Sequence, residues 1–99
     1  MGMSVIIRSY TGTIEATCCH PALDALCQQA TQAGFPGIGN VDKYDDTVFN
    51  RSQMRLVIPE LTQLSLSVPT PVAEAAEEVL AMARTIERLS HRYLVFNGD

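Results

Sequence analysis

Two cysteines and a histidine, Cys18, Cys19 and His20, stand together just before an expected helix that starts at about Pro21. A thiol close to the positive end of a helix dipole can have a lowered pKa and act as a nucleophile. Such a cysteine also needs a base within hydrogen-bond distance, and consecutive strand residues point to opposite faces, which separates Cys19 from His20. We therefore favour the alternative in which the thiols pack as small apolar groups and His20 caps the helix or meets solvent.

Acidic side chains form a second candidate site, where Asp42, Asp45 and Asp46 could offer oxygen ligands to calcium or magnesium. The spacing differs from that of the EF-hand loop, because Tyr44 occupies the third position and no glycine occupies the sixth. A solvated acidic turn explains these residues better. We expect neither a metal nor another cofactor.

Polar side chains also surround the start of the second expected helix, at Asn50, Arg51, Gln53 and Arg55. Arg51 could clamp a carboxylate or a phosphate there. The alternative is a capping box between Asn50 and Gln53, with surface ion pairs to the nearby aspartates. No catalytic residue is assigned, and the candidate ligand-binding residues are Tyr44, Asp45, Asp46, Phe49, Asn50 and Arg51.

The elements that must position these residues begin with a β-hairpin, in which the Thr11-Gly12 turn joins the strands 4–10 and 13–17. Strict alternation would put Ile14 and Ala16 on one face of the second strand. A helix then runs from about Pro21 to Ala33 and places Cys27 on its apolar stripe. The glycine- and aspartate-rich segment 34–47 is predicted to be a long irregular loop, and loops of this length commonly bind something or move.

Helical spacing dominates the second half of the chain. A helix follows Asn50 and is expected to kink or split at Pro59, which removes a backbone hydrogen bond. A longer helix runs from Pro71 to about Leu89, and Tyr93–Phe96 forms a hydrophobic last strand. The predicted fold is a single α+β domain over residues 1–99, with a sheet of three or four strands covered by about three helices.

Composition excludes several classes of function. The 99 residues carry a net charge of −4 and a single lysine, Lys43, which argues against nucleic-acid binding. No apolar run is long enough for a membrane span, and the N-terminus does not resemble a secretory signal. An odd number of cysteines, three, suits a reducing cytoplasm.

Two stretches, Asp45–Arg51 continuing through Pro59–Leu61, and His91–Asp99, resemble segments of small bacterial single-domain proteins of uncharacterised function. This resemblance implies no activity, ligand or catalytic residue. The small size, the acidity and the ending of helix then strand are similar in architecture to nuclease inhibitors such as barstar.

The leading hypothesis is a non-enzymatic binding or interaction protein, acting as a homodimer or other homo-oligomer. It would engage a protein or a small molecule through the segment 34–47, because the sequence lacks a convergent nucleophile, base and acid. One alternative is a small enzyme that uses a cysteine or polar-loop site near Cys18–His20. Another is an acidic inhibitor or immunity-type protein.

Overall fold

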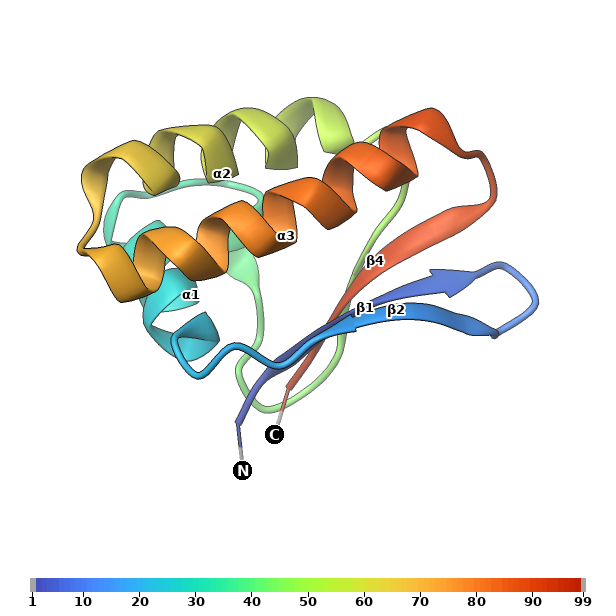
Figure 1. Ribbon diagram of the computed structural model, residues 1–99, viewed down its shortest axis with the longest axis horizontal. Helices are drawn as coiled ribbons and strands as arrows, with labels where there is room; N and C mark the ends of the chain where they lie inside the picture. Colours follow the sequence, from blue (N-terminus) through green and yellow to red (C-terminus); the bar gives the residue numbers. More distant parts are fainter. Residues whose placement is uncertain (1, 99) are drawn as a thin grey trace.

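Four strands form one antiparallel sheet in the order β2-β1-β4-β3 in the computed structural model of the chain. The structure describes residues 2–98, so Met1 and Asp99 lie outside the described residues. Figure 1 shows the helices together on one side of this sheet. The predicted α+β class is thereby confirmed, with the larger of the two expected strand numbers.

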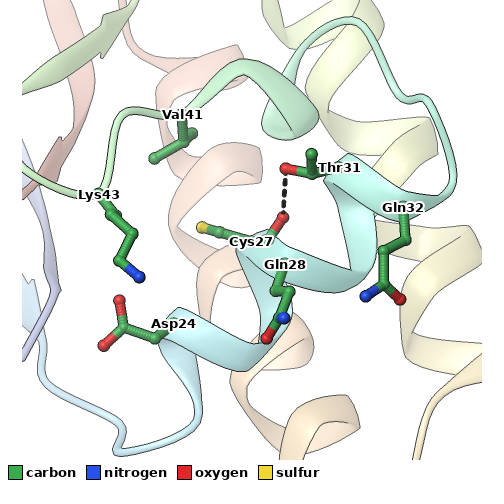
Figure 2. A pocket seen from close by; sticks show the side chains of 7 residues that line it. All are labelled: Asp24, Cys27, Gln28, Thr31, Gln32, Val41 and Lys43. Atoms are coloured by element: carbon green, nitrogen blue, oxygen red, sulfur yellow. Dashed lines mark hydrogen bonds between the residues drawn. The ribbon is translucent and has the colours of Figure 1, made fainter.

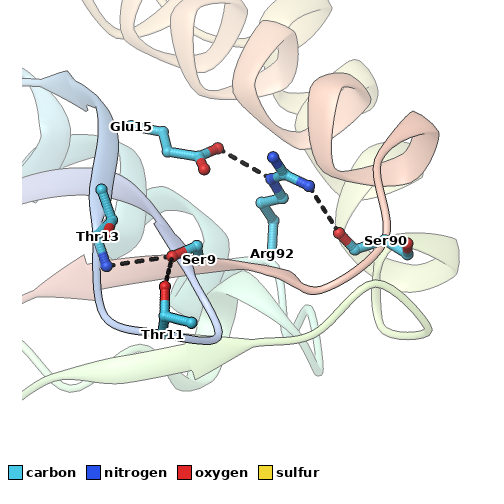
Figure 3. Close-up of polar contacts among 6 residues, drawn as sticks. All are labelled: Ser9, Thr11, Thr13, Glu15, Ser90 and Arg92. Carbon is cyan, nitrogen blue, oxygen red and sulfur yellow. Dashed lines mark hydrogen bonds and ion pairs between the residues drawn. The ribbon is translucent and has the colours of Figure 1, made fainter.

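The hairpin consists of β1 (Ser4–Ser9) and β2 (Ile14–Cys18), and Gly12 in its turn has a φ of 97°. The Ser9 hydroxyl lies 2.9 Å from the Thr11 hydroxyl and accepts a hydrogen bond from the Thr13 amide, which holds the turn closed (Figure 3). Positive φ favours glycine, so the predicted Thr11-Gly12 turn signal has a direct structural reason.

The alternation expected within β2 is wrong. Ile7 lies opposite Ala16 but Arg8 lies opposite Ile14, so Glu15 is an extra residue in a β-bulge. A bulge shifts the strand by one residue, and Ile14 therefore points to the face opposite that of Ala16. Glu15 instead accepts a 2.9 Å hydrogen bond from Arg92 Nε, whose guanidinium also donates to the Ser90 carbonyl (Figure 3).

The last strand, β4 (Arg92–Asn97), lies between β1 and the short edge strand β3 (Thr47–Phe49). Its residues Leu94 and Phe96 face the helices, Val95 faces the other way, and all three are fully buried. The predicted hydrophobic last strand is thus a central strand of the sheet, and it is buried on both faces.

Helix α1 (Leu23–Gln32) begins two residues after Pro21 and ends two residues before Gly34, which has a φ of 73°. Helix α3 (Thr70–Arg88) matches the predicted long helix. Helix α2 (Met54–Ser67) is not split at Pro59. The carbonyl that loses its amide partner there belongs to Arg55, which is exposed and can be hydrated.

The segment expected to be irregular contains a 3-10 turn, η1 (Ile38–Asn40), which is tied to α2. Both carboxyl oxygens of the buried Glu60 side chain accept backbone hydrogen bonds, one from Gly37 at 2.9 Å and one from Ile38 at 2.7 Å. These bonds seat the Ile38 side chain in the core. The loop is therefore a fixed part of the fold up to this point.

The sheet face away from the helices carries a row formed by Thr17, Ile6, Val95 and Val48. Ile6 and Val95 are buried because they lie on the two central strands, whereas 44% of Val48 is exposed. The bulge adds Ile14, 58% exposed, to the same face. No helix within residues 2–98 is both long and apolar enough to cross a membrane.

Candidate functional site

The six predicted ligand-binding residues lie on both sides of the short strand β3. Tyr44, Asp45 and Asp46 precede the strand and are exposed, and the backbone of the first two packs against Gly98. Phe49 is buried in the core, where its ring meets Phe96 edge-on at 5.7 Å. Asn50 and Arg51 follow the strand. An extended strand holds these groups apart, so the six side chains do not line one surface.

Asn50 forms capping hydrogen bonds with Gln53. The backbone N–H of Asn50 donates to Gln53 Oε1 at 2.8 Å, and Asn50 Oδ1 accepts from the backbone N–H of Gln53 at 3.0 Å. This reciprocal pair confirms the predicted capping box. Arg51 is not paired with an aspartate of residues 2–98, and its Nε donates to the carbonyl oxygen of Glu87 at 2.9 Å.

A cavity of about 420 Å³ lies between α1 and the chain segment that leads to β3 (Figure 2). We call it the α1 pocket, and it is lined by Asp24, Cys27, Gln28, Thr31, Gln32, Val41 and Lys43. Its volume falls within the range of small-molecule sites. The predicted binding segment 34–47 therefore contributes to a pocket, but through Val41 and Lys43 and not through the six candidates.

Helical spacing explains how α1 supplies this wall. Asp24, Gln28 and Gln32 recur every four residues and share one face. Thr31 joins the helix to the opposite segment, because its hydroxyl lies within hydrogen-bond distance of both the Cys27 carbonyl, at 3.0 Å, and the Gly39 carbonyl, at 2.9 Å. The polar repeat is visible in the sequence, but the same spacing is typical of any solvated helix face, so it did not mark a site.

Cys27 forms the inner wall of the α1 pocket and is confirmed as a core residue. Its thiol donates to the Met3 sulfur at 3.6 Å. Burial, with a smaller contribution from the charge of Asp24, raises the pKa of Cys27 to about 12. The thiol is thus protonated at neutral pH and cannot serve as a nucleophile there.

Cys18 is also unsuited to nucleophilic chemistry, whereas Cys19 beside it is exposed. Burial raises the pKa of the Cys18 thiol, and its 3.4 Å hydrogen bond to Glu78 Oε1 raises the pKa further. The lowered pKa considered from the sequence is therefore wrong for Cys18. Helix α1 begins only at Leu23, too far along the chain for its dipole to outweigh burial.

His20 does not act as a base toward Cys18 in this arrangement. Its Nδ1 accepts a 3.0 Å hydrogen bond from the Ala22 amide, which occupies that nitrogen's lone pair. Its Nε2 lies 3.7 Å from Glu74 and 4.0 Å from Glu78. The histidine therefore links the start of α1 to α3.

Comparison with protein-family models, curated proteins and solved structures finds no match for this chain. Function must then be inferred from the cavities and surfaces of the molecule itself. Within residues 2–98, no three histidine, cysteine, aspartate or glutamate side chains are grouped to hold a metal ion.

A second cavity, of about 380 Å³, lies where α2 begins and α3 ends. We call it the arginine cavity, and it is lined by Arg51, Ser52, Arg55 and Glu87. Arg51 belongs to the predicted set and lines this cavity. The sequence could not identify Glu87, because it joins the site only through the antiparallel packing of α3 on α2.

Proposed function

We propose that the chain is a non-enzymatic binding protein that holds a small polar ligand in the α1 pocket. The observation on which this rests is a pocket with an acid, two amides and an amine around a thiol that burial keeps protonated. Such groups bind a ligand through hydrogen bonds and charge, but none of them is poised to attack it.

The charges of the pocket favour a ligand that is itself both cationic and anionic. Asp24 and Lys43 point toward each other across the pocket in Figure 2, yet no ion pair joins them. A zwitterion such as an amino acid could present its ammonium to Asp24 and its carboxylate to Lys43. The amides of Gln28 and Gln32 supply further donors and acceptors nearby.

The experiment is thermal denaturation of the protein in the presence of the twenty amino acids, their amine analogues and their carboxylic-acid analogues. A ligand at ten times its Kd raises the free energy of unfolding by about 1.4 kcal/mol, which is several degrees in a domain of this size. We expect a zwitterion to stabilise the wild type, and Asp24→Asn or Lys43→Met to abolish the effect.

A variant that fills the pocket tests the location independently of charge. Gln28→Trp should remove the stabilisation, whereas Gln63→Trp, at an exposed position of α2 outside the pocket, should retain it. The proposal would be wrong if no compound stabilised the wild type, or if Gln28→Trp responded as the wild type does.

We also propose that the chain forms a homodimer through the sheet face away from the helices. The exposed Ile14 and Val48 lie at the two edges of this face, and the buried Ile6 and Val95 lie between them. A second copy can cover such a face in an isologous contact, in which both subunits use the same residues. The Glu15–Arg92 ion pair lies on the helix side of the sheet, because Arg92 alternates with Leu94 and Phe96, so it does not enter this contact. Arg8, opposite Ile14, lies on the proposed contact face.

Sedimentation velocity at tens of micromolar tests the dimer. Val48→Lys should shift the protein to monomer, because it places a charge in the contact. Leu66→Lys is the matched control, since Leu66 is 84% exposed but lies on α2. A monomeric wild type, or equal dissociation of both variants, would contradict the proposal. The acidic-inhibitor alternative stays a prediction, for which salt-sensitive binding to a cationic protein is the test.

A further inference from the structure

The arginine cavity combines two cationic side chains with a recess, and it shares no lining residue with the α1 pocket. Helices α2 and α3 are consecutive and pack antiparallel, so the start of α2 lies beside the end of α3 (Figure 1). Arg51 and Arg55 are four residues apart and line one cavity of about 380 Å³ with Ser52. This arrangement does not depend on the proposed function.

Among the described residues, neither guanidinium has an acidic partner. The ion pairs of residues 2–98 join Arg92 to Glu15 and His20 to Glu74 and Glu78. Glu87 lines the same cavity as Arg51 and Arg55, but its carboxylate oxygens lie beyond 4.0 Å from both guanidinium groups. Two positive charges therefore face the recess, and one unpaired carboxyl group at its border offsets only part of them.

Arg51 is also held in place before any ligand arrives. Its Nε donates to the Glu87 carbonyl at 2.9 Å, which anchors the guanidinium plane and leaves its terminal amino groups as donors. Pre-organisation of this kind lowers the entropy cost of binding. The amino end of α2 lies at the same place, and its partial positive charge adds to the two full charges.

We propose that the arginine cavity is a binding site for the phosphate group of a small phosphorylated molecule. Guanidinium groups bind tetrahedral oxyanions through paired N–H donors, and a dianion matches two guanidinium charges better than a single carboxylate does. The Ser52 hydroxyl supplies a neutral donor beside them. The negative charge of Glu87 repels a bound phosphate and weakens the site. A substitution that removes this charge is therefore a sensitive test.

Inorganic phosphate is the probe, titrated into the isotope-labelled full-length protein while backbone amide and arginine Nε–H shifts are followed by NMR. We expect saturable shifts at residues 51–55, with weaker binding of acetate. Arg55→Gln should weaken phosphate binding about tenfold, as expected for losing a charge-assisted hydrogen bond. Arg55 is preferred to Arg51 for this test because it does not bond to α3.

Two further variants decide between a site and a diffuse surface charge. Glu87→Gln should tighten phosphate binding, because the repelling carboxyl group is gone. Arg84→Gln removes the same charge from a position of α3 that does not line the cavity, and should change the Kd by less than about twofold. Absence of saturable shifts at residues 51–55, or equal weakening by Arg84→Gln and Arg55→Gln, would overturn the site. Acetate binding as tightly as phosphate would overturn the assignment to a phosphate group.

Discussion

At the scale of single residues, Glu60 shows how one side chain converts a flexible sequence into a fixed loop. The segment around Gly37 has no strand partner, yet both of its central amides are satisfied by the Glu60 carboxyl oxygens. A buried amide without an acceptor would be costly, so Glu60 determines where this segment lies. The sequence did not predict this role, because Glu60 stands inside an amphipathic helix where a glutamate usually faces solvent.

Glu60→Gln should therefore destabilise the protein. The amide side chain has one acceptor oxygen, so one of the two backbone N–H groups would face an NH₂ group and lose its bond. We expect the free energy of unfolding, measured by urea denaturation, to fall by about 1–3 kcal/mol. Glu77→Gln, at an exposed position of α3, should change it by less than about 0.5 kcal/mol.

The buried Cys27 thiol should make stability fall in alkali. Its pKa is raised from the ordinary 9.0 to about 12, so the unfolded chain releases this proton first as the pH rises. Between these two values the folded state binds more protons, and the free energy of unfolding decreases with pH. The slope from this group is at most about 1.4 kcal/mol per pH unit.

Urea denaturation of the wild type and of Cys27→Val from pH 8 to pH 11 measures this slope. The variant lacks the titrating thiol, so its stability should decline less steeply than that of the wild type. Identical slopes would show that the Cys27 thiol is not shielded from water as the structure indicates.

At the scale of elements, the α1 pocket depends on how closely η1 approaches α1. A side chain at Gly39 would place its Cβ atom 2.9 Å from the Ala30 carbonyl oxygen. Because that oxygen belongs to the helix backbone, it cannot move aside as a flexible side chain could. The glycine thus sets the distance between the two walls of the pocket.

Gly39→Ala should push the segment away from α1 and strain both elements. We expect a loss of about 1–3 kcal/mol in the free energy of unfolding, the usual cost of overpacking. Amide shifts of Thr31 and Lys43 should change with it. Gly2→Ala is the control, since no atom lies within 4 Å of the added methyl group. Equal stability of the two variants would mean that Gly39 does not pack as closely against the Ala30 carbonyl as the structure indicates.

At the scale of the whole molecule, β4 holds the N-terminal hairpin and β3 in one sheet. It pairs with β1 along six residues and with β3 along three, so the last strand of the chain completes a sheet begun by the first. The ring of Phe96 is fully buried. It packs against Phe49 of β3 and belongs to the core cluster that the helices cover. Folding should therefore be cooperative across the whole domain.

Phe96→Ala tests this role. Truncating a buried phenylalanine costs about 3–5 kcal/mol, a large part of the roughly 5–15 kcal/mol that stabilises a typical domain. Circular dichroism on heating should show a much lower Tm, with strands and helices lost together. Tyr44→Ala removes an aromatic ring that is 74% exposed and should leave the Tm nearly unchanged. Separate unfolding of the helices and strands would contradict a single cooperative unit.

The sequence by itself determined the local features of the fold. Periodicity and residues close in the chain predict the strands and helices, the Thr11-Gly12 turn, the Asn50–Gln53 capping box and the burial of Cys27. Each can be predicted from a local pattern, although the residues that bury Cys27, such as Met3, lie outside its own helix.

Only the tertiary structure decided which of the candidate residues share a cavity. Contacts between segments far apart in the chain produce the Glu15–Arg92 ion pair, the burial of Phe49, the raised pKa of Cys18 and the hydrogen bond between Arg51 and Glu87. Such contacts are set by strand pairing and by the packing of helices on the sheet. A pattern of neighbouring residue types does not encode them, because the same polar spacing suits both a pocket wall and a solvated helix face.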